Sequence, residues 1–205
     1  NLNNTTGGNV MVGDQVMKIA TTAFYNTIIG NEAGKSLTTG TNHTLIGYKA
    51  GQLLQTGTAC TIVGSEAGFS LTGAGSKHTA LGYQALYTEN NDLGDTTAIG
   101  YQALKLQNGS GTMFNTAVGG SAGATLTTGN SNVFIGQSTG SIITTGSNNV
   151  LIGKNAETAA NSDSNSIVIG KDAVGHGANI AVIGNDDTIA WHPSDDEIKV
   201  DLGSG

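Results

Sequence analysis

The sequence repeats one short pattern along almost its whole length. Two apolar residues followed by glycine occur eleven times, from Met11-Val12-Gly13 to Val182-Ile183-Gly184. Steps between successive glycines run from 14 to 19 residues and are most often 17. A register kept over this length identifies a repeat protein. The repeat glycines are Gly13, Gly30, Gly47, Gly64, Gly82, Gly100, Gly119, Gly136, Gly153, Gly170 and Gly184.

The length of the repeat selects the architecture. A 17-residue unit is too short for a helical-hairpin repeat, which needs about 33 residues. It fits one coil of a parallel β-solenoid, with two or three short strands joined by tight turns and coils stacked about 4.8 Å apart. We therefore predict an all-β fold over residues 1–184, a β-roll or β-helix of about eleven coils of 14–19 residues.

Each unit continues in a similar way after its glycine. Alanine usually stands three residues later, an aliphatic residue often returns after seven, and a Thr- and Gly-rich turn follows. A turn of this composition followed by a β-branched run indicates the start of a strand. The alanines are Ala33, Ala50, Ala67, Ala85, Ala103, Ala122, Ala156 and Ala173, and the aliphatic residues are Leu37, Leu54, Leu71, Leu126 and Ile143.

The two apolar residues before each glycine indicate that one chain is not enough. Neighbouring side chains on a strand point to opposite faces, so both faces of every strand carry an apolar row. One row can fill the inside of the coil, and the other needs a cover, because a long exposed apolar patch marks an interface. We expect a second and third copy of the chain to cover it in a homotrimer. The alternative is a single wide solenoid that holds both rows inside.

Composition excludes several functional classes. The chain has a net charge of −7 and no arginine, which disfavours nucleic-acid and phosphate binding. No apolar run is long enough to insert into a membrane. The Gly-rich segments Gly73-Ala74-Gly75 and Gly109-Ser110-Gly111 open no helix, so they predict turns and no phosphate-binding loop. We expect no enzyme activity and no cofactor. A chain that begins with Asn1 is expected to be processed or part of a longer protein.

One row of equivalent positions carries residues that can bind metals. Four residues before the repeat glycine the commonest residue is asparagine, but three consecutive units have His43, Cys60 and His78. Imidazole and thiolate are zinc ligands, so these are weak metal candidates. Coils about 4.8 Å apart place the outer two nearly 10 Å from each other, which is too far for one ion. A polar ladder bonded along the stack is the favoured interpretation.

The longer units between Gly82 and Gly119 carry a group of aromatic residues. Insertions in solenoids form loops on one face, which is often the binding face. The aromatic residues there are Tyr83, Tyr87, Tyr101 and Phe114. We regard them as a possible surface-contact site for a cell-surface glycan or a protein receptor. Simple variation in loop length is the alternative.

Threonine pairs suggest a different function. Thr38-Thr39, Thr127-Thr128 and Thr144-Thr145 recur at equivalent places, and a flat Thr-rich solenoid face can order water. Other units break the row, for instance at Gln55-Thr56. A monomeric ice-binding solenoid therefore stays open as an alternative.

The repeat stops after Gly184, and residues 185–205 differ in composition. They hold Trp191 and Pro193, the only tryptophan and the only proline of the chain. Terminal coils of solenoids need atypical caps, and Trp191 and Ile189 are suitable plugs. The alternating segment 198–202 can instead lead into a further domain, so cap and linker both remain open.

The repeat resembles two known families. Asn26-Thr27-Ile28-Ile29-Gly30 and the longer run 97–104 (TAIGYQAL) resemble the "NTAIGYQAL" repeats of bacteriophage tail fibres, which often precede a self-cleaving chaperone domain. The run 166–175 (SIVIGKDAVG) is similar to the head repeat of YadA-like trimeric autotransporter adhesins. The segment 194–199 echoes the start of such a chaperone domain. Both resemblances imply an extracellular homotrimeric fibre that attaches to a host surface.

Together these observations predict a structural and adhesive role. The expected location is a virion tail fibre or the extracellular cell surface, and a bacterial trimeric adhesin head is the alternative. The expected partners are other copies of the chain and a surface receptor.

Overall fold

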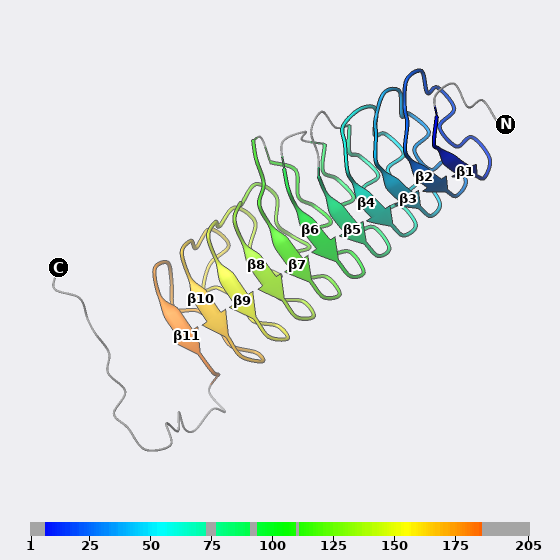
Figure 1. The fold of residues 1–205 in the computed structure, drawn as a ribbon. Coiled ribbons are helices and arrows are strands. Elements are labelled where there is room, and N and C mark those ends of the chain that lie inside the picture. The colour runs from blue at the N-terminus through cyan, green and yellow to red at the C-terminus, as the bar shows by residue number, and fades with distance from the viewer. Residues whose placement is uncertain (1–6, 73–76, 91–93, 110, 186–205) are drawn as a thin grey trace, which may run out of the picture.

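The computed structural model describes residues 7–72, 77–90, 94–109 and 111–185, and these form a parallel β-solenoid (Figure 1). Eleven strands of three residues pair in sequence order in one sheet. The predicted all-β solenoid is confirmed. The strands are β1 (Val10–Val12), β2 (Thr27–Ile29), β3 (Thr44–Ile46), β4 (Thr61–Val63), β5 (Thr79–Leu81), β6 (Thr97–Ile99), β7 (Thr116–Val118), β8 (Val133–Ile135), β9 (Val150–Ile152), β10 (Ile167–Ile169) and β11 (Ala181–Ile183).

Each coil contains one strand in place of the expected two or three. The rest of the coil still bonds to its neighbour, as in Glu32 N–H to Asp14 O at 2.9 Å and Gly34 N–H to Ala50 O at 3.0 Å. The backbone there is not extended, because residues two and four positions after the repeat glycine have positive φ, as at Glu32 and Gly34. The chain therefore turns continuously and forms only single bridges such as Phe24 with Thr41.

Three apolar rows fill the inside of the solenoid. The central residue of each strand from β2 to β10 is fully buried, with Phe134 the largest. The alanines three residues after the glycine and the aliphatic residues seven after it are buried in the same continuous core. The repeat register therefore corresponds directly to the packing, because the parallel strands pair without a shift between coils.

The repeat glycine is required by the distance between coils. At Gly100 the backbone has φ of 136°, a region that side chains rarely occupy. A Cβ on this residue would lie 2.4 Å from the carbonyl oxygen of Gly119 in the next coil. Equivalent contacts of 2.3–2.5 Å recur at Gly30, Gly47 and Gly64. Any other residue would push neighbouring coils apart at this corner.

The two ends of the solenoid leave their strands less covered. Met11 of β1 and Val182 of β11 are only half-buried, whereas the equivalent residues of β2 to β10 are fully buried. Trp191, Ile189 and the segments 194–199 and 198–202 lie outside the described residues. No helix in the described part of the chain is long and apolar enough to cross a membrane.

Candidate functional site

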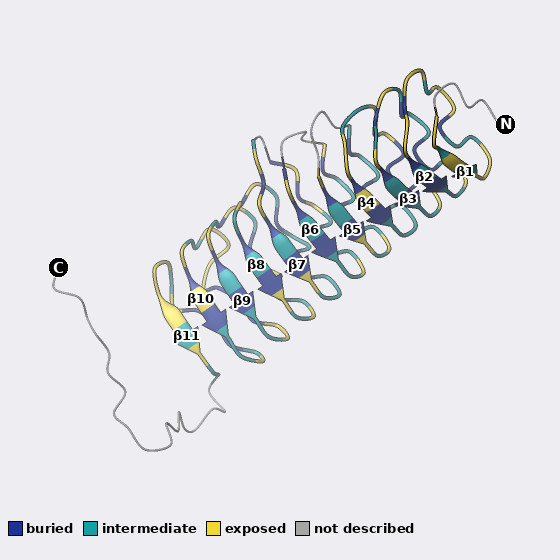
Figure 2. Cartoon of the chain, viewed as in Figure 1, coloured by how far each residue is buried: buried dark blue, intermediate teal, exposed yellow. Residues whose placement is uncertain are grey.

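The outer face of the sheet carries two continuous columns of side chains. In β2 to β10 the second residue is buried and the first and third are half-buried or exposed (Figure 2). Because neighbouring side chains on a strand point to opposite faces, the first and third residues lie on the outer face. We call these two columns the outer strand face. The third-residue column is Val12, Ile29, Ile46, Val63, Leu81, Ile99, Val118, Ile135, Ile152, Ile169 and Ile183. The first-residue column is Val10, Thr27, Thr44, Thr61, Thr79, Thr97, Thr116, Val133, Val150, Ile167 and Ala181.

The outer strand face is long, regular and uncharged. None of its 22 side chains is ionisable, although the chain as a whole carries a charge of −7. Leu81 is 45% exposed and Ile135 is 40% exposed, so large apolar surfaces face outward in mid-sheet. The sequence pattern predicted one apolar row inside and one outside, and this arrangement is what the structure has. The single wide solenoid with both rows inside is therefore wrong.

A buried polar row runs along the inside of the coil, one residue before each strand. Asn132 is typical: its side-chain N–H donates to Gly146 O at 2.9 Å, and its side-chain oxygen accepts the Asn149 N–H at 3.0 Å. Asn26, Asn115 and Asn149 each make the same pair of bonds. The row therefore satisfies backbone groups that the turns would otherwise leave buried and unpaired.

His43, Cys60 and His78 occupy this same row on consecutive coils and are all buried. His43 acts like the asparagines, because its Nδ1 accepts the Cys60 N–H at 3.2 Å. His78 Nδ1 likewise accepts the N–H of Thr96 at 3.3 Å. One ring nitrogen of each histidine is thereby engaged with the backbone. Among the described residues, no three His, Cys, Asp or Glu side chains lie together as a metal site.

Burial has a large electrostatic effect on His43. Removal from water lowers the pKa of this imidazole from 6.5 to about 4, while a contact with the Gly57 backbone acts weakly in the opposite direction. His43 is therefore neutral at physiological pH. A neutral ring that accepts at Nδ1 serves as a substitute for asparagine in the ladder.

The longer coils contain a polar group inside the core that sequence analysis missed. Glu89 and Gln107 stand seven residues after their repeat glycines, where five other coils have leucine or isoleucine, and both are buried. Gln107 Nε2 donates to Glu89 Oε2 at 2.7 Å and to Thr96 Oγ1 at 3.0 Å. Asn115 Nδ2 donates to Gln107 Oε1 at 2.8 Å. Two polar residues in a row of aliphatic ones were visible in the sequence, and this break could have indicated the buried polar group.

The structure divides the predicted aromatic site into separate parts. Tyr83 and Tyr101 both follow a repeat glycine and stack with ring centroids 5.6 Å apart. Tyr87 stacks instead on Phe69, at 5.1 Å, and these two stand at equivalent positions four residues further along their coils. Phe114 is 55% exposed, just before β7. Phe69 was not predicted, although its equal offset from the repeat glycine marks it as the neighbour of Tyr87.

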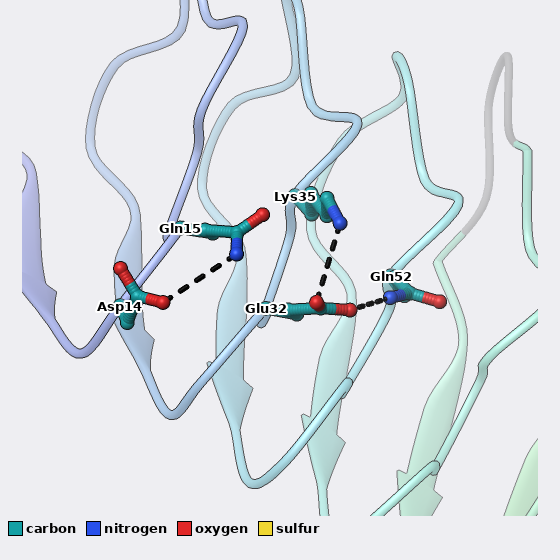
Figure 3. Close-up of polar contacts among 5 residues, drawn as sticks. All are labelled: Asp14, Gln15, Glu32, Lys35 and Gln52. Carbon is teal, nitrogen blue, oxygen red and sulfur yellow. Dashed lines mark hydrogen bonds and ion pairs between the residues drawn. The ribbon is translucent and has the colours of Figure 1, made fainter.

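A row of polar side chains accompanies the tyrosines, two residues after each repeat glycine. At the N-terminal end, Glu32 pairs with Lys35 at 3.3 Å and accepts a hydrogen bond from Gln52, while Gln15 contacts Asp14 (Figure 3). Every residue of this row from Gln15 to Asp172 has a φ between 52° and 57°. The conformation is costly for non-glycine residues, but it projects ten consecutive side chains from the same corner.

Comparisons with protein-family models, with curated proteins and with solved structures find no match to this chain. Function must therefore be inferred from the outer strand face, the polar rows and the aromatic residues.

Proposed function

We propose that the chain is a structural and adhesive segment of an extracellular trimeric fibre, in which the outer strand face is the contact between copies. The observation that carries this proposal is the unbroken aliphatic column on that face. The chain would belong to a phage or phage-like tail fibre, with the head of a bacterial surface adhesin as the alternative. The chain would lengthen the fibre and attach it to a host surface, and it would catalyse no reaction.

The dimensions of the outer strand face suit an interface between copies. Eleven strands about 4.8 Å apart give a strip roughly 50 Å long. Strands of three residues make the strip about 10 Å wide, so it offers roughly 500 Å² per copy and would form the centre of an interface to which the neighbouring turns add area. Because the face is uncharged, two copies can meet there despite their net negative charge, and interface cores are typically depleted of charge.

Three copies are favoured over two by the resemblance to tail-fibre and adhesin repeats. Three parallel solenoids can turn their outer strand faces towards a common axis and leave the other sides of each coil in water. A parallel arrangement would also bring equivalent coils to the same height, so that aliphatic residues of equal size meet along the axis.

Paired charge substitutions test the proposed interface. Ile135→Lys/Ile152→Lys introduces two charges on the outer strand face, and Thr128→Lys/Thr145→Lys introduces two at exposed turn positions. Sedimentation velocity should show monomers with solenoid circular dichroism for the first variant and an unchanged trimer for the second. Equal sedimentation of both variants and the unmodified chain would refute this interface.

A second function is favoured by one specific observation. Six consecutive strands, β2 to β7, present threonine in their first position, in parallel register from Thr27 to Thr116. Such a flat column can order water in the manner of an ice-binding face. The threonine pairs are less suitable, because Thr38 and Thr127 use their hydroxyls to bond the next coil. Thermal hysteresis from a monomeric chain would favour this function, since ice and other copies compete for one face.

A further inference from the structure

The two stacked tyrosines form an exposed platform at the corner beyond the strands. Tyr83 follows β5 and Tyr101 follows β6, in the turns that continue from those arrowheads in Figure 1. The backbone holds them on successive coils, because Gln102 N–H donates to Tyr83 O at 2.9 Å. Their rings are within 18° of parallel and are 44% and 55% exposed. The ring faces therefore point along the length of the solenoid.

Small residues border this platform on both sides. The equivalent position is Ser65 in the preceding coil and Gly120 in the following one. Apart from Gly120 itself and its two chain neighbours, no residue has an atom within 4 Å of the place that a Gly120 Cβ would occupy. Beyond Ser65 stands Tyr48, two coils and therefore about 10 Å from Tyr83. Lys49 Nζ lies over the Tyr48 ring, 5.0 Å from its centroid, so the stacking surfaces of this group are the ring faces of Tyr83 and Tyr101 that adjoin the small residues.

Pre-positioned hydrogen-bonding groups lie beside the platform. Gln102 Nε2 donates to Gln84 Oε1 at 3.0 Å, and Gln84 Nε2 donates to Glu66 Oε2 at 2.8 Å. This line fixes the orientation of both amides, and each amide nitrogen carries a second N–H in addition to the one used here. Groups that are already ordered lose little freedom when a ligand binds.

We propose that Tyr83 and Tyr101, with the line Glu66–Gln84–Gln102, bind a hexopyranose ring of a neutral surface glycan. A pyranose has a face of C–H groups that suits the negative face of an aromatic ring. Its hydroxyls can donate to Glu66 and accept from the amides. Anionic ligands are disfavoured by the net charge of −7 and the absence of arginine. This inference rests on the proposed adhesive function and specifies its receptor.

A single platform of this size is expected to bind weakly, with a Kd on the order of 1 mM. Three copies on one fibre would present the platform three times, which raises the apparent affinity for a dense surface. Loss of both rings should therefore reduce retention on immobilised glycan far more than it reduces binding of one sugar in solution.

The test uses the full chain on an array of immobilised neutral, amino-sugar and sialylated oligosaccharides. Tyr83→Ala/Tyr101→Ala should lower retention at least about tenfold, while Tyr87→Ala, which removes the other stacked pair, should leave it unchanged. Gly120→Gln extends a side chain beside Tyr101 and should also weaken binding without removing a ring. Saturation-transfer NMR with the methyl glycoside of the best array sugar should show transfer to the C–H face of the pyranose.

The outcomes separate this inference from the proposed fibre. A chain of trimeric mass that is retained by no glycan on the array overturns the inference and leaves the fibre intact. Retention that is equal in the double tyrosine variant and in Tyr87→Ala also overturns it, because the binding site is then elsewhere. A monomeric chain that loses glycan retention with the tyrosines would instead support the platform and contradict the trimeric fibre.

Discussion

Replacement of one repeat glycine should destabilise the solenoid strongly. In Gly100→Ala the new Cβ would lie 2.4 Å from Gly119 O and 2.6 Å from the carbonyl carbon. The backbone at φ of 136° costs an alanine about 1–3 kcal/mol. Moving the neighbouring coil to relieve the contact costs a similar amount. The free energy of unfolding should therefore fall by about 4 kcal/mol.

Gly120→Ala is the matched control for this substitution. It lies one coil further along, and no residue other than its two chain neighbours has an atom within 4 Å of the place its Cβ would occupy. A substitution in open space at an ordinary backbone conformation should change stability by less than about 0.5 kcal/mol.

Urea unfolding at one fixed chain concentration measures both variants. With an m-value of about 2 kcal/mol/M, the Gly100→Ala midpoint should fall by about 2 M while the Gly120→Ala midpoint stays in place. Equal midpoints for the two variants would refute the reasoning, because the close approach of coils would then not require glycine.

Two other perturbations address the buried polar groups. The pKa of His43 is about 4 in the fold and 6.5 when exposed, so between these pH values the unfolded chain binds more protons than the folded chain. The contribution of His43 to the free energy of unfolding should therefore be full above pH 6.5 and fall by about 3 kcal/mol on acidification to pH 4. His43→Asn should abolish this dependence of stability on pH, and an unchanged dependence in that variant would contradict the assignment. Gln107→Leu should cost roughly 2 kcal/mol, because Glu89 loses a buried hydrogen bond at 2.7 Å. Calorimetry should show that the double variant Glu89→Leu/Gln107→Leu regains stability relative to Gln107→Leu. If the losses of the two single variants simply add in the double variant, the two side chains are not coupled.

The core of the fold could be predicted because one register governs both sequence and packing. Residues at equal offsets from the glycine, such as Ala33 and Ala50, occupy the same row in space, so periodicity alone identifies the buried side. The outward third-residue column followed from alternation along the strand, whereas the first-residue column was not predicted. Only the number of strands in a coil was wrong, because positive φ at residues such as Glu32 and Lys49 has no signature in residue type.

The candidate surface sites could be predicted less completely. Equal offset from the repeat glycine would have paired Tyr83 with Tyr101 and Tyr87 with Phe69, as the structure does. Closeness in sequence suggested a single group with Phe114, but position around the coil, and not distance along the chain, determines which side chains meet. The same rule holds for Glu89, whose offset of seven residues from the repeat glycine places it inside the core.

The mass of the unmodified chain in solution tests the central claim most directly. Light scattering coupled to size exclusion should give three times the chain mass of 20.6 kDa, because the outer strand face would be buried between copies. A mass of one chain, unchanged as concentration rises, would contradict the account and leave the threonine column as the feature to explain.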